Sequence, residues 1–248
     1  MAVPDIPERL NAATVFIDAH LAEGRGERTA LRWRDQTISY AELAAKVNQT
    51  GNALRRLGVR AEERVLLVVL DSPAFAYGFW GALKIGAVPV PVNTALRAED
   101  YAYLLDDSRA STLMLWPTLA PVARTRPVSS IIIGAAQPGG MAFDECIASE
   151  ASELEPHPSH RDDAALWLYS SGSTGLPKGV VHQHRNLVYC AETYAREILA
   201  IGPDQSGCAA PVFRLWAGRR HEFRPAGRRD GRAGTRAPDS GRYVSRYQ

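Results

Sequence analysis

Four hydroxyl side chains, three glycines and one lysine occur within the ten residues from 170 to 179. Glycines allow successive backbone N–H groups to turn into one concavity that binds phosphate. Ser170, Ser171, Ser173 and Thr174 add hydroxyl donors, and Lys178 adds a positive charge. Lys178 is one of only three lysines in a chain that otherwise uses arginine. The combination predicts a loop that binds a polyphosphate; a flexible surface loop is the alternative.

Three known loop motifs do not fit this segment. A Walker A loop requires Gly-Lys-Ser or Gly-Lys-Thr, whereas Lys178 follows Pro177 and precedes Gly179. The Gly-x-Ser-x-Gly nucleophile elbow is excluded because Gly172 and Gly175 are too close together. A Ser-x-x-Lys pair ending at Lys178 would require serine in place of Gly175.

An α/β fold is expected to hold this loop. Residues 64–70 form a continuous apolar run, which is typical of a strand buried on both faces. The alternation of helical and strand-like segments predicts a mostly parallel sheet flanked by helices. The expected helices cover residues 11–22, 39–57, 73–85 and 97–107, and the expected strands cover residues 30–33, 36–39, 64–70, 87–92, 112–115, 129–133 and 164–169.

Turn and capping residues mark the ends of these elements. Ser39 and Glu42 have the spacing of a capping box. Asp71 and Ser72 are expected to cap a helix whose first turn contains Pro73. The predicted loops and connectors cover residues 121–127, 135–140 and 153–160. No repeat or low-complexity linker divides the first 210 residues, which are therefore predicted to form one incomplete domain.

Composition favours a globular protein of the cytoplasm. Hydrophobic residues make up 46% of the chain and charged residues 23%. The N-terminus lacks the basic and apolar regions of a signal peptide, and the longest strongly apolar run, residues 65–70, is too short to cross a bilayer. Three widely spaced cysteines lack metal-ligand pairing and favour a packing role. No membrane partner and no oligomeric state are predicted.

The segment from Tyr169 to Gly179 resembles the signature loop of the acyl-adenylate-forming (AMP-binding) superfamily. This superfamily includes acyl-CoA synthetases, luciferases and peptide-synthetase adenylation domains. Similarity extends over about residues 10–210, and further family-like motifs lie at residues 38–43, 81–93 and 103–110. The segments that look most like benzoate- and 4-hydroxybenzoate-CoA ligases are residues 88–94, 168–175 and 191–195.

The resemblance implies the N-terminal part of the large domain of an adenylate-forming enzyme, and a two-step reaction. A carboxylate attacks the α-phosphorus of ATP, giving an acyl adenylate and pyrophosphate, and coenzyme A then takes the acyl group as a thioester. The resemblance implies ATP, Mg²⁺ as the metal cofactor and coenzyme A as the cosubstrate, with an aromatic carboxylate as the substrate. By the family's pattern, the nucleotide-contacting residues are Ser170, Ser171, Gly172, Ser173, Thr174, Gly175 and Lys178.

Histidines and aromatic residues give weaker signals. His182 and His184 lack further ligands at the spacing of a metal site, so no metal centre is predicted. We expect both histidines to frame the start of a helix near Asn186. The aromatic residues of the 73–85 helix are expected to pack one helix face, with a substrate pocket as the alternative; they are Phe75, Tyr77, Phe79 and Trp80.

The chain changes character after about residue 210. From Arg214 onward it has ten arginines against three acidic residues, whereas the preceding part has 19 basic and 24 acidic residues. Reading the codons of residues 215–218 one base later permits Tyr-Gly-Leu-Gly, which is similar to the family, and residues 228–233 permit a second match. We therefore expect residues 211–248 to be a frameshifted, disordered tail rather than a nucleic-acid-binding arm. The catalytic residues are unknown, because the family places them beyond this point.

These observations favour an ATP-dependent aryl-carboxylate:CoA ligase that activates benzoate or a hydroxybenzoate. The alternatives are a fatty-acyl or cinnamate-type ligase, an adenylation domain that loads a carrier protein, and a non-catalytic fragment. The family's pocket residues that would separate the substrates lie mostly beyond residue 210. This chain by itself is expected to be inactive.

Overall fold

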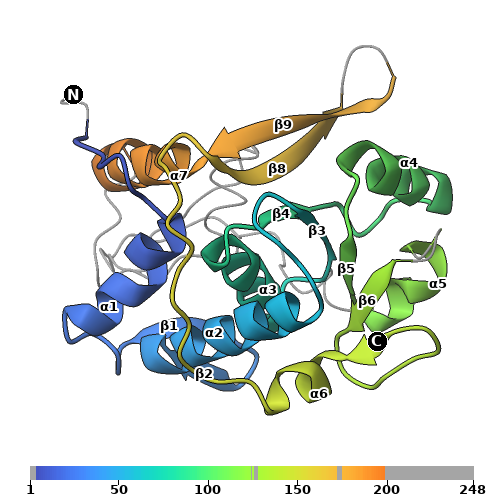
Figure 1. Cartoon of the computed structure of the whole chain (residues 1–248), viewed down its shortest axis with the longest axis horizontal. Helices are drawn as coiled ribbons and strands as arrows, with labels where there is room; N and C mark the ends of the chain where they lie inside the picture. The colour runs from blue at the N-terminus through green and yellow to red at the C-terminus, as the bar shows by residue number, and fades with distance from the viewer. Residues whose placement is uncertain (1–3, 124, 126–127, 172–174, 199–248) are drawn as a thin grey trace, which may run out of the picture.

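The computed structural model describes residues 4–123, 125, 128–171 and 175–198 of the chain. A five-stranded sheet lies at its centre, and every pair of neighbouring strands in it is parallel (Figure 1). The expected mostly parallel sheet with flanking helices is therefore confirmed. In spatial order, the strands are β4 (Val88–Pro91), β3 (Arg64–Val68), β5 (Thr112–Leu115), β6 (Ser129–Ile132) and β7 (Met141–Ala142).

Helices flank the sheet (Figure 1). Two of the helical segments, η1 and η3, are π-helices, and η2 is a 3₁₀-helix. Within the described ranges, no helix has the length and apolarity needed to cross a membrane. The segments are η1 (Thr14–Asp18), α1 (Ala19–Ala22), α2 (Tyr40–Arg56), α3 (Pro73–Lys84), α4 (Ala98–Ser108), η2 (Pro117–Leu119), α5 (Ala120–Ala123), α6 (Phe143–Ala148), α7 (His184–Cys190) and η3 (Ala191–Ile198).

The alternating side chains of β3 divide the core into two parts. Val65 and Leu67 belong to the core that also contains buried residues of α2 and α3. Leu66 and Val68 point to the opposite face and share a second core with α4. Because successive side chains of a strand point to opposite faces, a continuous apolar run is required where helices cover both.

Two antiparallel hairpins accompany the central sheet. One consists of β1 (Thr29–Trp33) and β2 (Gln36–Ser39), and the other of β8 (Ala164–Ser171) and β9 (Pro177–Gln183). Strand β8 packs beside β4, the end strand of the central sheet (Figure 1). Leu168 of β8 packs against the core of α2 and α3, whereas Trp167 and Tyr169 pack against the core of α4. The second hairpin therefore continues the two-sided packing of the sheet.

Local sequence signals set several helix ends. Ser39 Oγ accepts a hydrogen bond from the Glu42 N–H at 3.2 Å, and Glu42 Oε2 accepts one from the Ser39 N–H at 2.8 Å, which confirms the capping box of α2. The expected cap of α3 is wrong in one respect. Ser72 occupies the N-cap position, but its hydroxyl donates to the Leu70 carbonyl at 3.0 Å and accepts no hydrogen bond from the first N–H groups of the helix. Pro73 lies in the first turn as expected.

The end of one strand and several short elements differ from the sequence-based expectations. Strand β3 ends at Val68, and not at residue 70, because its pairing with β4 and β5 ends there. Helix α5 occupies part of the predicted loop at residues 121–127. The sequence does not predict β7 or α6, since two and six residues are too few to show a hydrophobic period.

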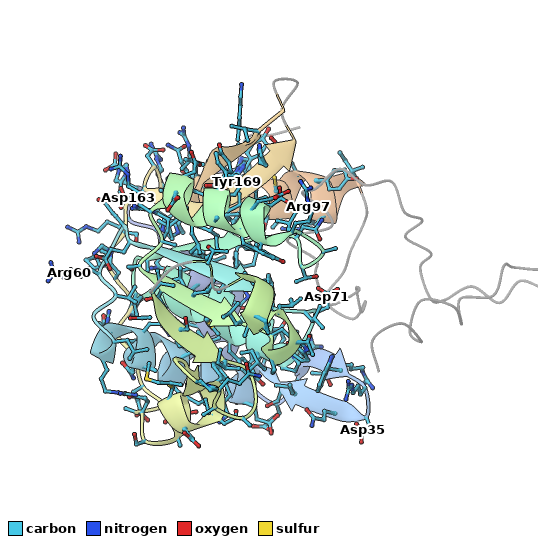
Figure 2. The ribbon with its side chains drawn as sticks, turned by 90° about the vertical axis from the view of Figure 1, so that its right-hand side faces the viewer. Asp35, Arg60, Asp71, Arg97, Asp163 and Tyr169 are labelled. Carbon is cyan, nitrogen blue, oxygen red and sulfur yellow. The ribbon has the colours of Figure 1, made fainter. Side chains whose placement is uncertain are left out.

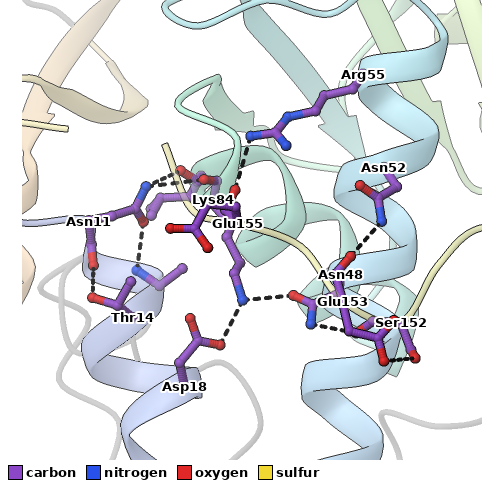
Figure 3. Close-up of polar contacts among 12 residues, drawn as sticks. Asn11, Thr14, Asp18, Asn48, Asn52, Arg55, Lys84, Ser152, Glu153 and Glu155 are labelled. Carbon is purple, nitrogen blue, oxygen red and sulfur yellow. Dashed lines mark hydrogen bonds and ion pairs between the residues drawn. The ribbon is translucent and has the colours of Figure 1, made fainter. Parts of the chain in front are cut away.

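A buried lysine joins three helical segments (Figure 3). Lys84, at the end of α3, is 2% exposed, and its Nζ donates to Asp18 Oδ1 of η1 and to Asn48 Oδ1 of α2, both at 2.7 Å. Asn11 Nδ2 donates to the carbonyls of Leu83 and Lys84 at 3.1 and 3.2 Å. These carbonyls belong to the last turn of α3, which lacks partners within the helix. The end of α3 is thereby fixed to the N-terminal segment.

Candidate functional site

The β8–β9 hairpin brings Ser170 and Lys178 directly opposite each other. Residues that face each other in an antiparallel pair project from the same side of the ribbon, with Cβ atoms about 5 Å apart. Both residues are exposed. In the described part of the chain, the Lys178 side chain makes no ion pair and no hydrogen bond. The hairpin therefore presents a hydroxyl and an ammonium group together to solvent, which suits an anionic ligand.

The other candidate residues lie between the two strands. Gly175 has a φ of +94°, a conformation that glycine adopts without the steric cost of a Cβ. The backbone of Ser171 belongs to β8 and is paired with Pro177. Gly172, Ser173 and Thr174 lie outside the described residues. The structure thus brings Ser170 and Lys178 together, and the contact of the seven residues with a nucleotide stays a prediction.

Helix α4 is hydrogen-bonded to both strands of the hairpin. Tyr103 Oη donates to the Pro177 carbonyl of β9 at 2.9 Å, and Tyr169 Oη of β8 donates to Asp107 Oδ2 at 2.6 Å. Figure 2 shows Tyr169 where the hairpin meets α4. Burial and the hydrogen bond to Asp107 raise the pKa of the Tyr169 hydroxyl, so its proton is held more tightly than that of an exposed tyrosine. Both Tyr103 and Asp107 lie in the family-like motif at residues 103–110, where no signal in the sequence distinguishes them from their neighbours.

Two histidines, His182 at the end of β9 and His184 at the start of α7, are buried. Burial lowers the pKa of His182 and of His184 to about 4. His184 Nδ1 accepts a hydrogen bond from the Ala12 N–H at 3.0 Å, which ties the start of α7 to the N-terminal helical segment. Helix α7 begins at His184, two residues before the expected start at Asn186. Among the described residues, no group of three or more His, Cys, Asp or Glu side chains could hold a metal ion.

The aromatic residues of α3 pack in the core. Phe79 is 2% exposed and contacts Trp80 edge to face, with ring centroids 5.0 Å apart. Phe75 and Tyr77 are partly buried against the same core. This arrangement agrees with the expected packing role.

Comparison with known proteins identifies the class to which this fold and hairpin belong. The sequence model described as AMP-binding enzyme matches residues 19–216, most of the chain. The chain therefore belongs to the AMP-binding enzyme family. The predicted tail at residues 211–248 and its boundary lie outside the described residues.

Several of the relatives are named as CoA ligases of aromatic acids. The chain is 42% identical to a benzoate–CoA ligase of Thauera aromatica, over 79% of the chain and 38% of that protein. It is 38% identical to a 4-hydroxybenzoate–CoA/benzoate–CoA ligase of Rhodopseudomonas palustris, over 82% of the chain and 39% of that protein. An anthranilate CoA ligase solved in complex with anthranoyl-AMP superposes with a TM-score of 0.74 at 33% identity, over 79% of the chain and 39% of that structure. The chain spans about two fifths of the length of these relatives.

Proposed function

We propose that this chain provides the ATP-phosphate-binding part of an aryl-carboxylate:CoA ligase. The observation that carries the proposal is the placement of the Ser170 hydroxyl opposite the Lys178 ammonium group, next to the turn end of the β8–β9 hairpin. The relatives named as benzoate and hydroxybenzoate ligases support an aromatic carboxylate as the substrate. The reaction is proposed for a complete ligase that contains this chain.

The proposed reaction follows from the chemistry of an acyl adenylate. A carboxylate oxygen attacks the α-phosphorus of Mg-ATP, the bond to the β-phosphate oxygen breaks, and pyrophosphate leaves. The thiol of coenzyme A then loses its proton to solvent, its sulfur attacks the acyl carbon, and AMP leaves with the bonding electrons. In the first step, Ser170 and Lys178 would hold the β- and γ-phosphates together with Ser171, Gly172, Ser173, Thr174 and Gly175. The ammonium group would stabilise the charge that develops on pyrophosphate.

Binding of Mg-ATP to the 248-residue chain tests the proposal. Removing a hydrogen bond to a charged group costs about 1.5–3 kcal/mol. Lys178→Ala should therefore weaken Mg-ATP binding about 10- to 150-fold in calorimetric titrations. Lys46→Ala is the matched control, because Lys46 is an exposed lysine on α2, away from the hairpin. Equal affinities for the wild type and Lys178→Ala would contradict the proposed function.

Pyrophosphate exchange in a complete ligase separates the substrate classes. Exchange that depends on benzoate or a hydroxybenzoate supports the aryl ligase, and exchange that depends only on fatty or cinnamic acids supports the alternative ligases. The chain alone should show no exchange. Exchange by the chain alone would contradict the proposal that it needs the rest of a ligase.

The boundary near residue 210 is part of the same proposal. Residues 1–210 would form the N-terminal part of the AMP-binding domain, and residues 211–248 would be a non-homologous tail. The end of the family match at residue 216 lies close to this boundary. The encoding DNA tests it: a frame shifted by one base after codon 210 should continue the family sequence, and a shifted frame without that similarity would refute the frameshift.

A further inference from the structure

Helix α4 holds the hairpin through two side chains on one helix face. Tyr103 and Asp107 are four residues apart, which places them one helical turn from each other. Tyr103 reaches β9 at the Pro177 carbonyl, and Asp107 reaches β8 at the Tyr169 hydroxyl. One rigid element therefore contacts both strands of the hairpin.

The two contacts lie one residue from the candidate phosphate ligands. Tyr169 immediately precedes Ser170 in β8, and Pro177 immediately precedes Lys178 in β9. Ser170 and Lys178 face each other in the register of the hairpin. Because side chains alternate along a strand, Ser170 projects from the side opposite to Tyr169. The helix therefore contacts the hairpin at the residues next to Ser170 and Lys178, and it leaves the side chains of these two residues open to solvent.

Helix α4 is itself anchored firmly enough to act as a support. Its apolar face is buried, with Tyr101 and Leu105 0% exposed and Leu104 1% exposed. Its last carbonyl, that of Ser108, accepts a hydrogen bond from Arg64 Nε of β3 at 2.6 Å. Strand β9, in contrast, pairs only with β8 among the described residues.

We propose that Tyr103 and Asp107 are positioning residues that set the distance and orientation of Ser170 and Lys178 toward the phosphates of ATP. This inference rests on the proposed function of the hairpin. In this proposal neither residue contacts the nucleotide: Tyr103 acts through the backbone of β9, and Asp107 acts through the Tyr169 side chain of β8. A well-placed ammonium group gains more from a phosphate than one on a mobile strand, since less ordering is required on binding.

A double-mutant cycle tests positioning against a general loss of structure. Tyr103→Phe removes one oxygen atom and should weaken Mg-ATP binding by the 248-residue chain about 3- to 10-fold. If Tyr103 acts through Lys178, adding Tyr103→Phe to Lys178→Ala should cause little further loss. Additive losses, or an unchanged affinity in Tyr103→Phe, would overturn the role of Tyr103. Tyr189→Phe is the matched control, because the exposed Tyr189 lies on α7.

The Asp107 contact is tested from both of its ends. Asp107→Ala and Tyr169→Phe should each weaken Mg-ATP binding about 3- to 10-fold, so that loss of folding in one variant leaves the other informative. Asp107→Asn keeps an oxygen acceptor for Tyr169 and should restore nearly wild-type affinity. Tighter binding in both Asp107 variants would show that the carboxylate acts only by repelling phosphate, which overturns the positioning role. If Lys178→Ala has no effect, the proposed function fails; if only the tyrosine and aspartate variants have none, this inference fails alone.

Discussion

Replacing Asp18 with alanine removes the acidic partner of a lysine that is almost completely buried. The Lys84 side chain is 3% exposed, whereas that of Asp18 is 32% exposed. After the substitution, Asn48 Oδ1 at 2.7 Å is the remaining side-chain acceptor that the structure describes for Lys84 Nζ. A neutral acceptor compensates a buried charge less well than a carboxylate, so we expect Asp18→Ala to destabilise the junction of η1, α2 and α3.

The exposure of Asp18 sets the size of the effect. Removing one partner of a fully buried ion pair costs about 3–5 kcal/mol, and an exposed pair contributes about 0–1 kcal/mol. Because one third of the Asp18 side chain is open to water, water replaces part of its interaction, and we expect a loss of about 2–3 kcal/mol. For a domain of this size, each kcal/mol lowers the melting temperature by roughly 2–4 °C. The expected decrease is therefore about 4–12 °C.

Urea denaturation followed by circular dichroism measures this loss. The midpoint should fall with an unchanged slope, which indicates a change in stability and not in the denatured state. Asp35→Ala, at the exposed turn between β1 and β2 (Figure 2), should change the free energy of unfolding by less than about 0.5 kcal/mol. Adding Lys84→Met to Asp18→Ala removes the stranded charge and should recover part of the loss. An Asp18→Ala midpoint equal to that of the wild type would refute the role of the buried pair.

Three further predictions concern pH, capping and the loop. Burial lowers the pKa of His184 to about 4 from the ordinary 6.5, so the unfolded chain binds the proton first as the pH falls. The stability that the neutral form provides is complete above pH 6.5 and is lost towards pH 4; urea titrations should show this decline, with a smaller slope in His184→Asn. Ser39→Ala removes the cap of α2 and should lower the free energy of unfolding by about 1 kcal/mol in the same assay, and an unchanged midpoint would contradict it. Thr174→Ala in a complete ligase should slow pyrophosphate exchange about 10- to 150-fold, and an unchanged rate would count against the loop assignment.

The sequence predicts the elements whose causes are local. The capping box of Ser39 and Glu42 involves residues three apart, and the buried strand at residues 112–115 has the expected bounds, since its hydrophobic run carries the signal. For the candidate site, residue types alone indicate Ser170 and Lys178 as phosphate ligands. Their pairing across the hairpin is not predicted, because register depends on the number of residues in the intervening turn.

The contacts that support the site join residues far apart in the sequence. The bond from Tyr103 spans 74 residues and the bond to Asp107 spans 62. The hydrophobic periodicity of α4 and that of β8 each predict a buried face, but they do not indicate how far apart the two elements lie in the fold. The same holds for Lys84, whose partners lie 66 and 36 residues away. Helical spacing predicts where such a side chain lies on its helix, but only the packing of helices on the sheet decides which partner it meets.

The two faces of β3 pack against different helices: one face packs against the helices joined by Lys84, and the other packs against the helix that contacts the candidate site. Val65 and Leu67 pack with α2 and α3, where Lys84 joins the helices, whereas Leu66 and Val68 pack with α4, which holds the hairpin. Asp18→Ala should therefore lower the melting temperature and leave Mg-ATP affinity unchanged below that temperature. Tyr103→Phe should do the opposite, because it removes a contact at the surface of a well-buried helix. If both substitutions changed affinity and stability in proportion, the two faces would act as one cooperative unit, and a separate positioning role of α4 would be refuted.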